Sequence, residues 1–226
     1  MLTAVFDLDG TLADTSGDLI EGANRALADL GVAGRLDPRV DAGISGRGGL
    51  AMLRLGLERS GETLDDAALQ ATWREFIRHY EMVIADTSRF FPGAAEALDA
   101  LRAEGWRLAV CTNKPERLAH RLLEALGELG RFDALVGADT LPVRKPDPAP
   151  FHEAVARAGG RGDRAIMIGD TATDRRTAEA AGVPCVLVDF GVSADDVRAL
   201  GADTVIDDYA DLAAALAALV PRLAPV

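Results

Sequence analysis

The hydrophobic pattern from about Pro92 to the C-terminus alternates between short apolar runs and segments with helical spacing. Each run has the length of a strand, and in each segment that follows, apolar residues recur every three or four positions. The expected strands are 107–111, 134–136, 165–168, 184–188 and 204–206, and the expected helices start near Ala94, Pro115, Pro148, Ala172 and Asp211. Strands that alternate with helices through short connections are typical of a parallel sheet covered on both faces. We therefore predict an α/β fold with a Rossmann-like parallel sheet.

A different pattern occupies the residues from about Thr15 to Arg89. Helical spacing continues throughout this stretch. At roughly seventy residues, the stretch is too long to be a loop. We expect a small all-helical domain inserted between the first strand and the α/β repeat. The predicted boundaries are 1–14 and 90–226 for the α/β core and 15–89 for the insert, with hinges near 14–18 and 88–92.

Composition narrows the set of partners. The formal net charge of −12 over 226 residues argues against nucleic acid or an anionic membrane, since both favour clustered Lys and Arg. An anionic small substrate remains compatible with this charge, because a metal ion and one or two cations can dominate a small cleft. No apolar run approaches the roughly eighteen residues that span a bilayer, and a basic region followed by an apolar stretch is absent from the N-terminus. Cys111 and Cys185 lie in apolar runs and are expected to be reduced core thiols. We predict a cytoplasmic monomer or homodimer acting on a small molecule.

The first strand, Leu2 to Phe6, leads directly into Asp7-Leu8-Asp9-Gly10-Thr11. Burying an unpaired carboxylate costs several kcal/mol, so two Asp residues after a buried strand indicate a site at the carboxyl edge of the sheet. Two other structures could contain this segment. A hairpin turn at Asp9-Gly10 would need an alternating return strand, and a calcium loop would need Gly where Leu12 stands. Neither explains the segment as well as a functional site does.

Polar residues follow three other expected elements. They are Thr112, Asn113, Lys145, Asp170 and Asp174. Because parallel strands end at one edge, these side chains can converge although they are far apart in sequence. Single members have structural explanations, such as a helix N-cap at Asp170 or a first-turn acid at Asp174. The five residues together indicate a functional site more specifically than any one of them does.

The chemistry of this set is that of phosphoryl transfer. Several carboxylates without a nearby His or Cys favour Mg²⁺ over Zn²⁺. One carboxylate can act as a nucleophile, and a second can protonate the leaving oxygen and later activate water. Thr and Lys supply a hydroxyl donor and a point charge to phosphate oxygens. Phosphoryl transfer needs mainly positioning and charge neutralisation, which these residues offer.

The same residues resemble the four ordered motifs of the haloacid dehalogenase superfamily, over essentially the whole chain. The matching segments are Asp7–Leu12, Thr112-Asn113, Lys145-Pro146 and Gly169–Asp174. The resemblance implies Asp7 as nucleophile, Asp9 as general acid/base, and Thr112, Asn113 and Lys145 as substrate-binding residues. It also implies Mg²⁺ held by Asp7, the main-chain carbonyl of Asp9 and Asp170, with Asp174 in a supporting role. The helical insert resembles the cap that closes over substrate.

Within the superfamily the chain looks most like phosphoglycolate phosphatases, through 137–142 and 145–150. Asp9 disfavours the dehalogenase branch, which lacks this second Asp, and the absence of Lys from 15–89 disfavours phosphonate hydrolysis. Arg47 is the candidate substrate reader, because it lies in the Gly-rich stretch Gly43–Gly49, expected to be a loop, and its guanidinium suits a carboxylate. A solvated surface Arg is the alternative.

Two other functions remain open at this point. A sugar phosphomutase of the same superfamily is suggested by Gly43-Ile44-Ser45-Gly46-Arg47, although a further basic residue close by is missing. A receiver module, which accepts phosphate on Asp without turnover, would share the acidic cluster, the Thr and the Lys. Asp9 and the helical insert argue against the receiver. A Mg²⁺-dependent phosphatase, with phosphoglycolate as the first substrate to try, is the preferred hypothesis.

Overall fold

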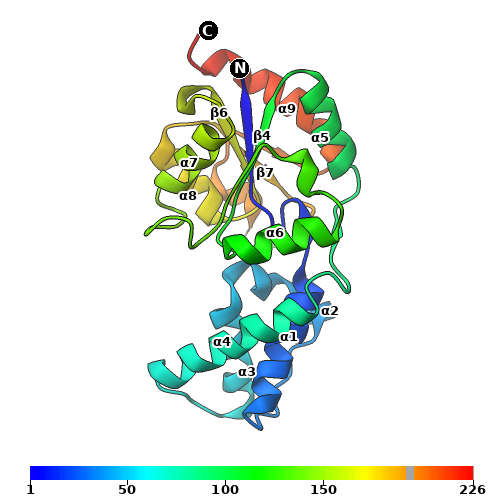
Figure 1. The fold of residues 1–226 in the computed structure, drawn as a ribbon, viewed down its shortest axis with the longest axis vertical. Coiled ribbons are helices and arrows are strands. Elements are labelled where there is room, and N and C mark those ends of the chain that lie inside the picture. The colour runs from blue at the N-terminus through cyan, green and yellow to red at the C-terminus, as the bar shows by residue number, and fades with distance from the viewer. Residues whose placement is uncertain (192–195, 226) are drawn as a thin grey trace. The chain divides into compact units, whose positions relative to one another are not determined.

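The computed structural model describes residues 1–191 and 196–225, which divide into two compact units. Residues 1–13, 90–191 and 196–225 form an α/β unit, here called the core unit. Residues 14–89 form an all-α unit, here called the helical unit. The colours of Figure 1 separate them, because the helical unit runs from blue to cyan and the core unit holds the first strand and everything from green to red.

The core unit is built on a six-stranded, wholly parallel sheet in the order β5-β4-β1-β6-β7-β8. The strands are β1 (Thr3–Phe6), β4 (Arg107–Cys111), β5 (Ala134–Val136), β6 (Ala165–Gly169), β7 (Cys185–Val188) and β8 (Thr204–Ile206). Thr3 of the central strand β1 pairs with Arg107 on one side and with Ala165 on the other. The predicted Rossmann-like parallel sheet is confirmed.

Helices cover both faces of this sheet. They are α5 (Ala94–Ala103), α6 (Glu116–Ala125), α7 (Ala149–Arg157), α8 (Ala172–Ala181) and α9 (Leu212–Leu219). Strand side chains alternate between faces, and Val5 and Met167 pack with Phe151 and Val155 of α7 in one buried cluster. Figure 1 shows α7 and α8 on one side of the sheet and α5 and α9 on the other. Short 3-10 turns complete the unit at Leu129–Arg131, Gly162–Arg164, Val197–Leu200, Tyr209–Asp211 and Val220–Arg222.

The helical unit packs its helices around α1 (Ser16–Asp29). The others are α2 (Pro38–Asp41), α3 (Gly49–Ser60) and α4 (Asp66–Met82), with a 3-10 helix at Ala42–Arg47. Gly22 on α1 lies against the backbone of Tyr80 on α4, where a Cβ atom would be only 3.0 Å from the Tyr80 Cα, so glycine permits this close approach. Two short strands, β2 (Ala13–Asp14) and β3 (Arg89–Phe90), pair where the chain enters and leaves the unit.

One local expectation for this unit was wrong. The stretch Gly43–Gly49 is not an open loop, because Ala42–Arg47 forms a 3-10 helix and α3 begins at Gly49. Gly48 joins the two helices with a φ of 84°, a left-handed conformation that a side chain would disfavour. A Cβ atom on Gly49 would overlap the ring of Phe76, so tertiary packing against α4 explains the second glycine.

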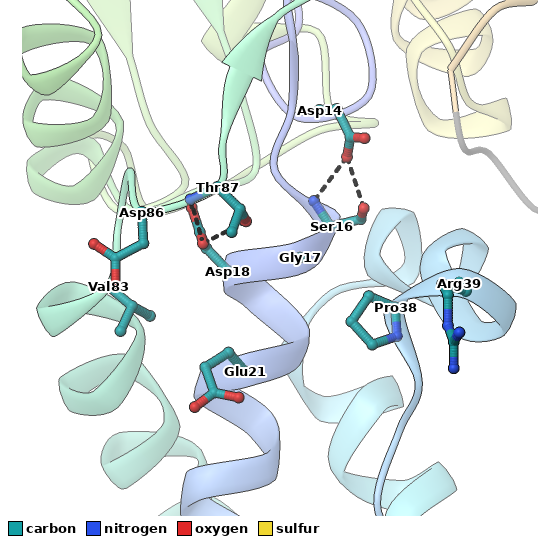
Figure 2. A pocket seen from close by; sticks show the side chains of 10 residues that line it. All are labelled: Asp14, Ser16, Gly17, Asp18, Glu21, Pro38, Arg39, Val83, Asp86 and Thr87. Carbon is teal, nitrogen blue, oxygen red and sulfur yellow. Dashed lines mark hydrogen bonds between the residues drawn. The ribbon is translucent and has the colours of Figure 1, made fainter.

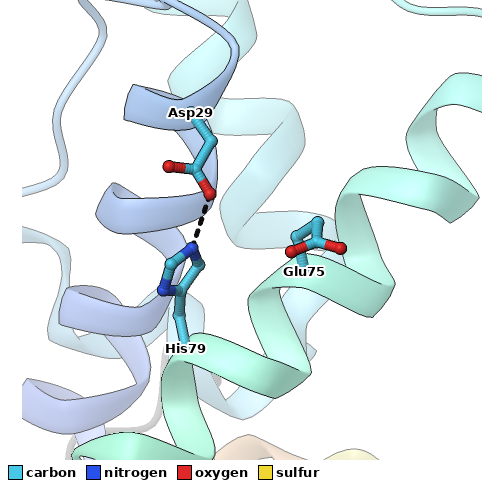
Figure 3. A group of neighbouring side chains, drawn as sticks. All are labelled: Asp29, Glu75 and His79. Carbon is cyan, nitrogen blue, oxygen red and sulfur yellow. Dashed lines mark hydrogen bonds and ion pairs between the residues drawn. The ribbon is translucent and has the colours of Figure 1, made fainter.

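His79 of α4 ties that helix to the last residue of α1. Its Nε2 atom lies 2.6 Å from Oδ2 of Asp29, and Figure 3 shows Glu75 beside the same pair, one helical turn earlier on α4. This contact between α1 and α4 gives His79 a structural role in the helical unit. Within the described residues, no helix has the length and apolar character needed to cross a membrane.

Candidate active site

The polar residues predicted to converge do meet at the carboxyl edge of the sheet in the core unit. Asp7 directly follows β1, and its backbone N–H donates to Ile168 of β6 at 2.9 Å. Asp170 directly follows β6, and Lys145 arrives from the connection between β5 and α7. One carboxylate oxygen from each of Asp7, Asp170 and Asp174 lies within 4.8 Å of the other two. The topology of the parallel sheet thus assembles one acidic site from distant segments.

Lys145 lies between two of these carboxylates. Its Nζ atom is 2.6 Å from Oδ1 of Asp174 and 3.1 Å from Oδ1 of Asp7, and its side chain is 1% exposed. Burial on its own would lower the pKa of Lys145, but Asp174 and Asp7 outweigh this effect and raise it above the ordinary value. The ammonium is therefore charged and serves as a fixed cation beside Asp7.

Asp174 holds this cation and also begins helix α8. Its Oδ2 atom accepts bonds from the backbone N–H of Thr171 at 3.1 Å and from the Thr171 hydroxyl at 2.7 Å, which completes a capping box. Thr171 is the N-cap, so the N-cap explanation for Asp170 does not apply. A Cβ atom on Gly169 would overlap Asp174, which explains why the strand ends in glycine. Asp174 is thus fully committed to Lys145 and to the helix terminus.

Asp7 and Asp170 are carboxylates in a strongly acidic, buried setting. Burial, which Lys145 offsets only partly, raises the pKa of Asp7 to about 6, with Asp174 and Asp9 adding to the increase. Burial and then the charges of Asp174 and Asp7 raise the pKa of Asp170 well above its ordinary value. Both shifts have the same two causes, which are burial of the carboxylate first and then an excess of negative charge among its neighbours.

A divalent cation fits this excess of charge. The donor set consists of oxygen atoms only, as Mg²⁺ prefers. Asp170 is held in place by the hydroxyl of Thr11, which donates to its Oδ1 at 2.8 Å. A Cβ atom on Gly10 would overlap Oδ2 of Asp170, so a residue with a side chain at position 10 would displace this oxygen. The residues present therefore suit the metal that the sequence led us to expect.

The side chain of Asp9 is not part of the group formed by Asp7, Asp170 and Asp174. Its Oδ1 accepts a hydrogen bond from Nζ of Lys114 at 2.7 Å, and the Lys114 side chain is 3% exposed. Sequence reasoning did not select Lys114. A signal was present, since Lys114 and Lys145 are the only two lysines among the 24 Lys and Arg residues of the chain. Both lysines lie at this site, each in contact with one of the two aspartates that follow β1.

Thr112 and Asn113 shape the loop after β4. The Thr112 hydroxyl oxygen accepts from the backbone N–H of Lys114 at 3.2 Å. The side-chain amide of Asn113 donates to the carbonyl of Lys145 at 3.1 Å, which joins two of the predicted motifs. Tyr209 was also missed, and its hydroxyl donates to the carbonyl of Thr11 at 2.8 Å across a separation of 198 residues. No local pattern in the sequence signals that contact.

Arg47 is not among the residues that the core unit assembles. It is an exposed residue of the helical unit, at the end of the 3-10 helix. Cys111 and Cys185 are free and buried, as expected, and burial raises the pKa of Cys111 to about 12. A thiol in that state is not a nucleophile near neutral pH.

Comparison with known proteins agrees with this arrangement. A family model described as haloacid dehalogenase-like hydrolase matches residues 1–182. The phosphoglycolate phosphatase of Rhodospirillum rubrum is 42% identical over 212 residues, which cover 92% of this chain and 88% of that protein. The phosphoglycolate phosphatase of Mesorhizobium japonicum is 40% identical, with coverage of 97% and 96%.

The fold comparison gives the same family. A crystal structure described as a predicted phosphoglycolate phosphatase from Haemophilus somnus superposes with a TM-score of 0.84 at 28% sequence identity. The match covers 95% of this chain and 97% of that one. Sequence, fold and the acidic sheet edge together lead to one conclusion, that this chain belongs to the haloacid dehalogenase-like hydrolase family.

Proposed function

We propose that the chain is a Mg²⁺-dependent phosphatase that hydrolyses a small phosphorylated metabolite, with phosphoglycolate as the first choice. Its relatives make it a phosphoric monoester hydrolase, and two of them are phosphoglycolate phosphatases of similar length. The observation that supports the mechanism most directly is the Asp7 carboxylate beside the Lys145 ammonium, within the acidic group it forms with Asp170 and Asp174. A nucleophile next to a fixed cation and several metal-binding oxygens suits attack on a phosphate ester.

The reaction has two steps, and both use the same pair of aspartates. An oxygen of Asp7 attacks phosphorus, the bond from phosphorus to the ester oxygen breaks, and Asp9 gives its proton to the leaving alcohol. Water then attacks the aspartyl-phosphate, Asp9 takes a proton from that water, and Asp7 is released with inorganic phosphate. Thr112 and Lys145 bind phosphate oxygens through a hydroxyl and an ammonium, while Asn113 holds the backbone of Lys145.

The metal would be held by Asp7, the main-chain carbonyl of Asp9 and Asp170. Asp174 would support it indirectly, since it fixes Lys145 and the start of α8. When bound, Mg²⁺ supplies positive charge that neutralises the phosphate oxygens and the crowded carboxylates. The chain's own contribution is to orient Asp7 toward phosphorus and to oppose part of the rise in its pKa, through Lys145 and the backbone N–H of Leu8, which donates to its Oδ1 at 2.7 Å.

The helical unit is proposed to be the substrate-selecting cap, with the predicted core at 1–14 and 90–226 and the cap at 15–89. Asp18 accepts hydrogen bonds from Thr87 and Ser88, so the entering and leaving segments of this unit are joined near the two predicted hinges. Arg47 is the proposed reader of a substrate carboxylate. Cap residues of this kind would set affinity for one ester, while the core unit would perform the chemistry.

A panel of phosphorylated metabolites assayed with Mg²⁺ tests this function. We expect steady release of inorganic phosphate, highest with phosphoglycolate, and none from the folded D7N variant. A single stoichiometric burst without steady turnover would instead identify a receiver module. Conversion of one sugar phosphate to its positional isomer, without free phosphate, would identify a phosphomutase.

A further inference from the structure

We propose that Lys114 is a positioning residue, which orients the carboxylate of Asp9 for proton transfer to the leaving group. The inference rests on the proposed phosphatase function and adds a residue to it. Each of the two aspartates after β1 then has a lysine of its own, Lys145 for Asp7 and Lys114 for Asp9.

The backbone of Lys114 is fixed on both sides. Its N–H donates to the Thr112 hydroxyl oxygen at 3.2 Å, and its carbonyl accepts from the N–H of Ala138 at 2.9 Å. The side chain is buried, so its ammonium reaches Oδ1 of Asp9 from a rigid base. A flexible surface lysine could not fix the orientation of the Asp9 carboxylate in this way, because it would lose side-chain entropy on ordering.

The orientation of the Asp9 carboxyl group matters more than that of a carboxylate that transfers no proton. Its side chain is 21% exposed, and like charges on Asp7, Asp170 and Asp174 lie on the neighbouring part of the same edge. The ammonium of Lys114 fixes one oxygen of Asp9 and with it the rotation of the whole carboxyl group. A group that exchanges a proton must lie about 2.6–3.2 Å from the atom it serves, and a misplacement of about 1 Å can cost roughly 100-fold in rate.

The composition of the chain strengthens the argument. Of the 24 Lys and Arg residues, 22 are arginine, the buried Arg164 among them, and lysine occurs only at these two buried positions. Lysine offers a compact ammonium on a slender stem, whereas a guanidinium would occupy more of the buried space around Asp9. The choice of lysine at position 114 therefore suits the proposed contact with Asp9.

The test compares two phosphate esters that differ in their need for a proton. An alkyl ester, phosphoglycolate, releases a basic alkoxide that Asp9 must protonate, whereas p-nitrophenyl phosphate releases a stable phenolate that needs little help. For K114M we expect kcat/KM to fall on the order of 100-fold with the alkyl ester and less than about 5-fold with the aryl ester. D9N should show the same selective loss, and the K114M/D9N double variant should be no worse than D9N alone.

A structural role for Lys114 predicts a different pattern. Equal losses on both esters, or a double variant whose losses multiply, would overturn the proposal. The control is R176M, which removes an exposed cation from α8 of the same unit and should leave both esters unchanged. If the wild-type protein releases phosphate from neither ester, the proposed function fails, and the contact is then judged by the following measurement alone.

A second measurement covers the case in which K114M does not fold. Protein labelled with ¹⁵N at the lysine side chains can give only two ammonium signals, because the chain has two lysines. D9N should shift one of them strongly and D7N the other, as the contacts of Lys114 and Lys145 require. A D9N spectrum in which neither lysine signal moves would overturn the proposal without any assay of activity.

Discussion

Two regions of this protein bury carboxylates, and they do so in opposite ways. In the helical unit, Asp18 is 2% exposed and accepts bonds from the N–H and hydroxyl groups of Thr87 and Ser88, at 2.6–2.9 Å for the closest contact of each donor. Figure 2 shows Asp18 and Thr87 in this contact, beside a hollow of about 540 Å³. At the sheet edge of the core unit, three carboxylates instead face one another and one lysine.

The comparison shows that burial alone does not identify a functional carboxylate. The four donors around Asp18 replace the water that it lost on folding, and such a group stabilises a fold. Burial and then the negative charge of neighbouring aspartates raise the pKa values of Asp7 and Asp170, and Lys145 and the hydrogen-bond donors beside them offset this only partly. A buried acid that lacks compensation inside the protein indicates a ligand, here a cation and a phosphate ester.

Replacing Asp7 tests the functional side of this contrast and has the largest expected effect. D7N should lower kcat by about 10⁴-fold or more, because the amide cannot form the covalent intermediate. The variant should remain folded, since it removes a charge from an already acidic cluster. Phosphate release and circular dichroism check the two outcomes. Turnover within tenfold of the wild type would exclude the covalent mechanism.

Replacing Asp18 tests the structural side. D18A leaves two backbone N–H groups and two hydroxyls without their acceptor, and the free energy of unfolding should fall by about 3–5 kcal/mol. Urea unfolding measures this change. The matched control is D86A, which removes an exposed acid from the same hollow and should cost less than about 0.5 kcal/mol. Equal stability of D18A and D86A would contradict the structural role of Asp18.

The raised pKa of Asp7 predicts how stability depends on pH in metal-free protein. Its pKa is 3.8 ordinarily and about 6 when folded, so the folded state binds the proton more tightly. This contribution is complete below about pH 4 and is lost as pH rises through 6, with an upper limit of roughly 3 kcal/mol. Unfolding in EDTA at pH 4 to 8 measures it, and D7N should flatten the curve. Added Mg²⁺ should restore stability at pH 7, because it binds only the folded site. Identical pH curves for D7N and wild type would contradict the assignment.

Much of the core unit is predictable from sequence because its signals are local. The change from apolar β1 to Asp7 locates both a strand end and a site, and α8 begins at Ala172, where the sequence predicts a helix start, although Thr171 and not Asp170 is its N-cap. Parallel topology then brings the strand ends together without further information.

What sequence reasoning missed depends on contacts between distant segments. Lys114 and Asp9 are 105 residues apart, and Tyr209 and Thr11 are 198 apart, so no periodicity records either pair. The glycines of 43–49 were expected to form a loop, whereas Gly49 is small because Phe76 packs against it. Glycine signals both flexibility and close packing, and only the tertiary structure separates the two.

The smallest expected effect is a change in KM, and it tests whether the two units have separate roles in binding and in catalysis. If the helical unit contributes affinity and the core unit contributes chemistry, R47M should raise KM for phosphoglycolate about tenfold, through loss of about 1.4 kcal/mol of charge-assisted binding, and leave kcat nearly unchanged. It should not affect p-nitrophenyl phosphate, which has no carboxylate. R54M, an exposed arginine on α3, is the matched control. A loss of kcat on both esters would contradict these separate roles of the two units. Arg47 would then act on the reacting phosphate, which both esters share, and not on the carboxylate that distinguishes phosphoglycolate.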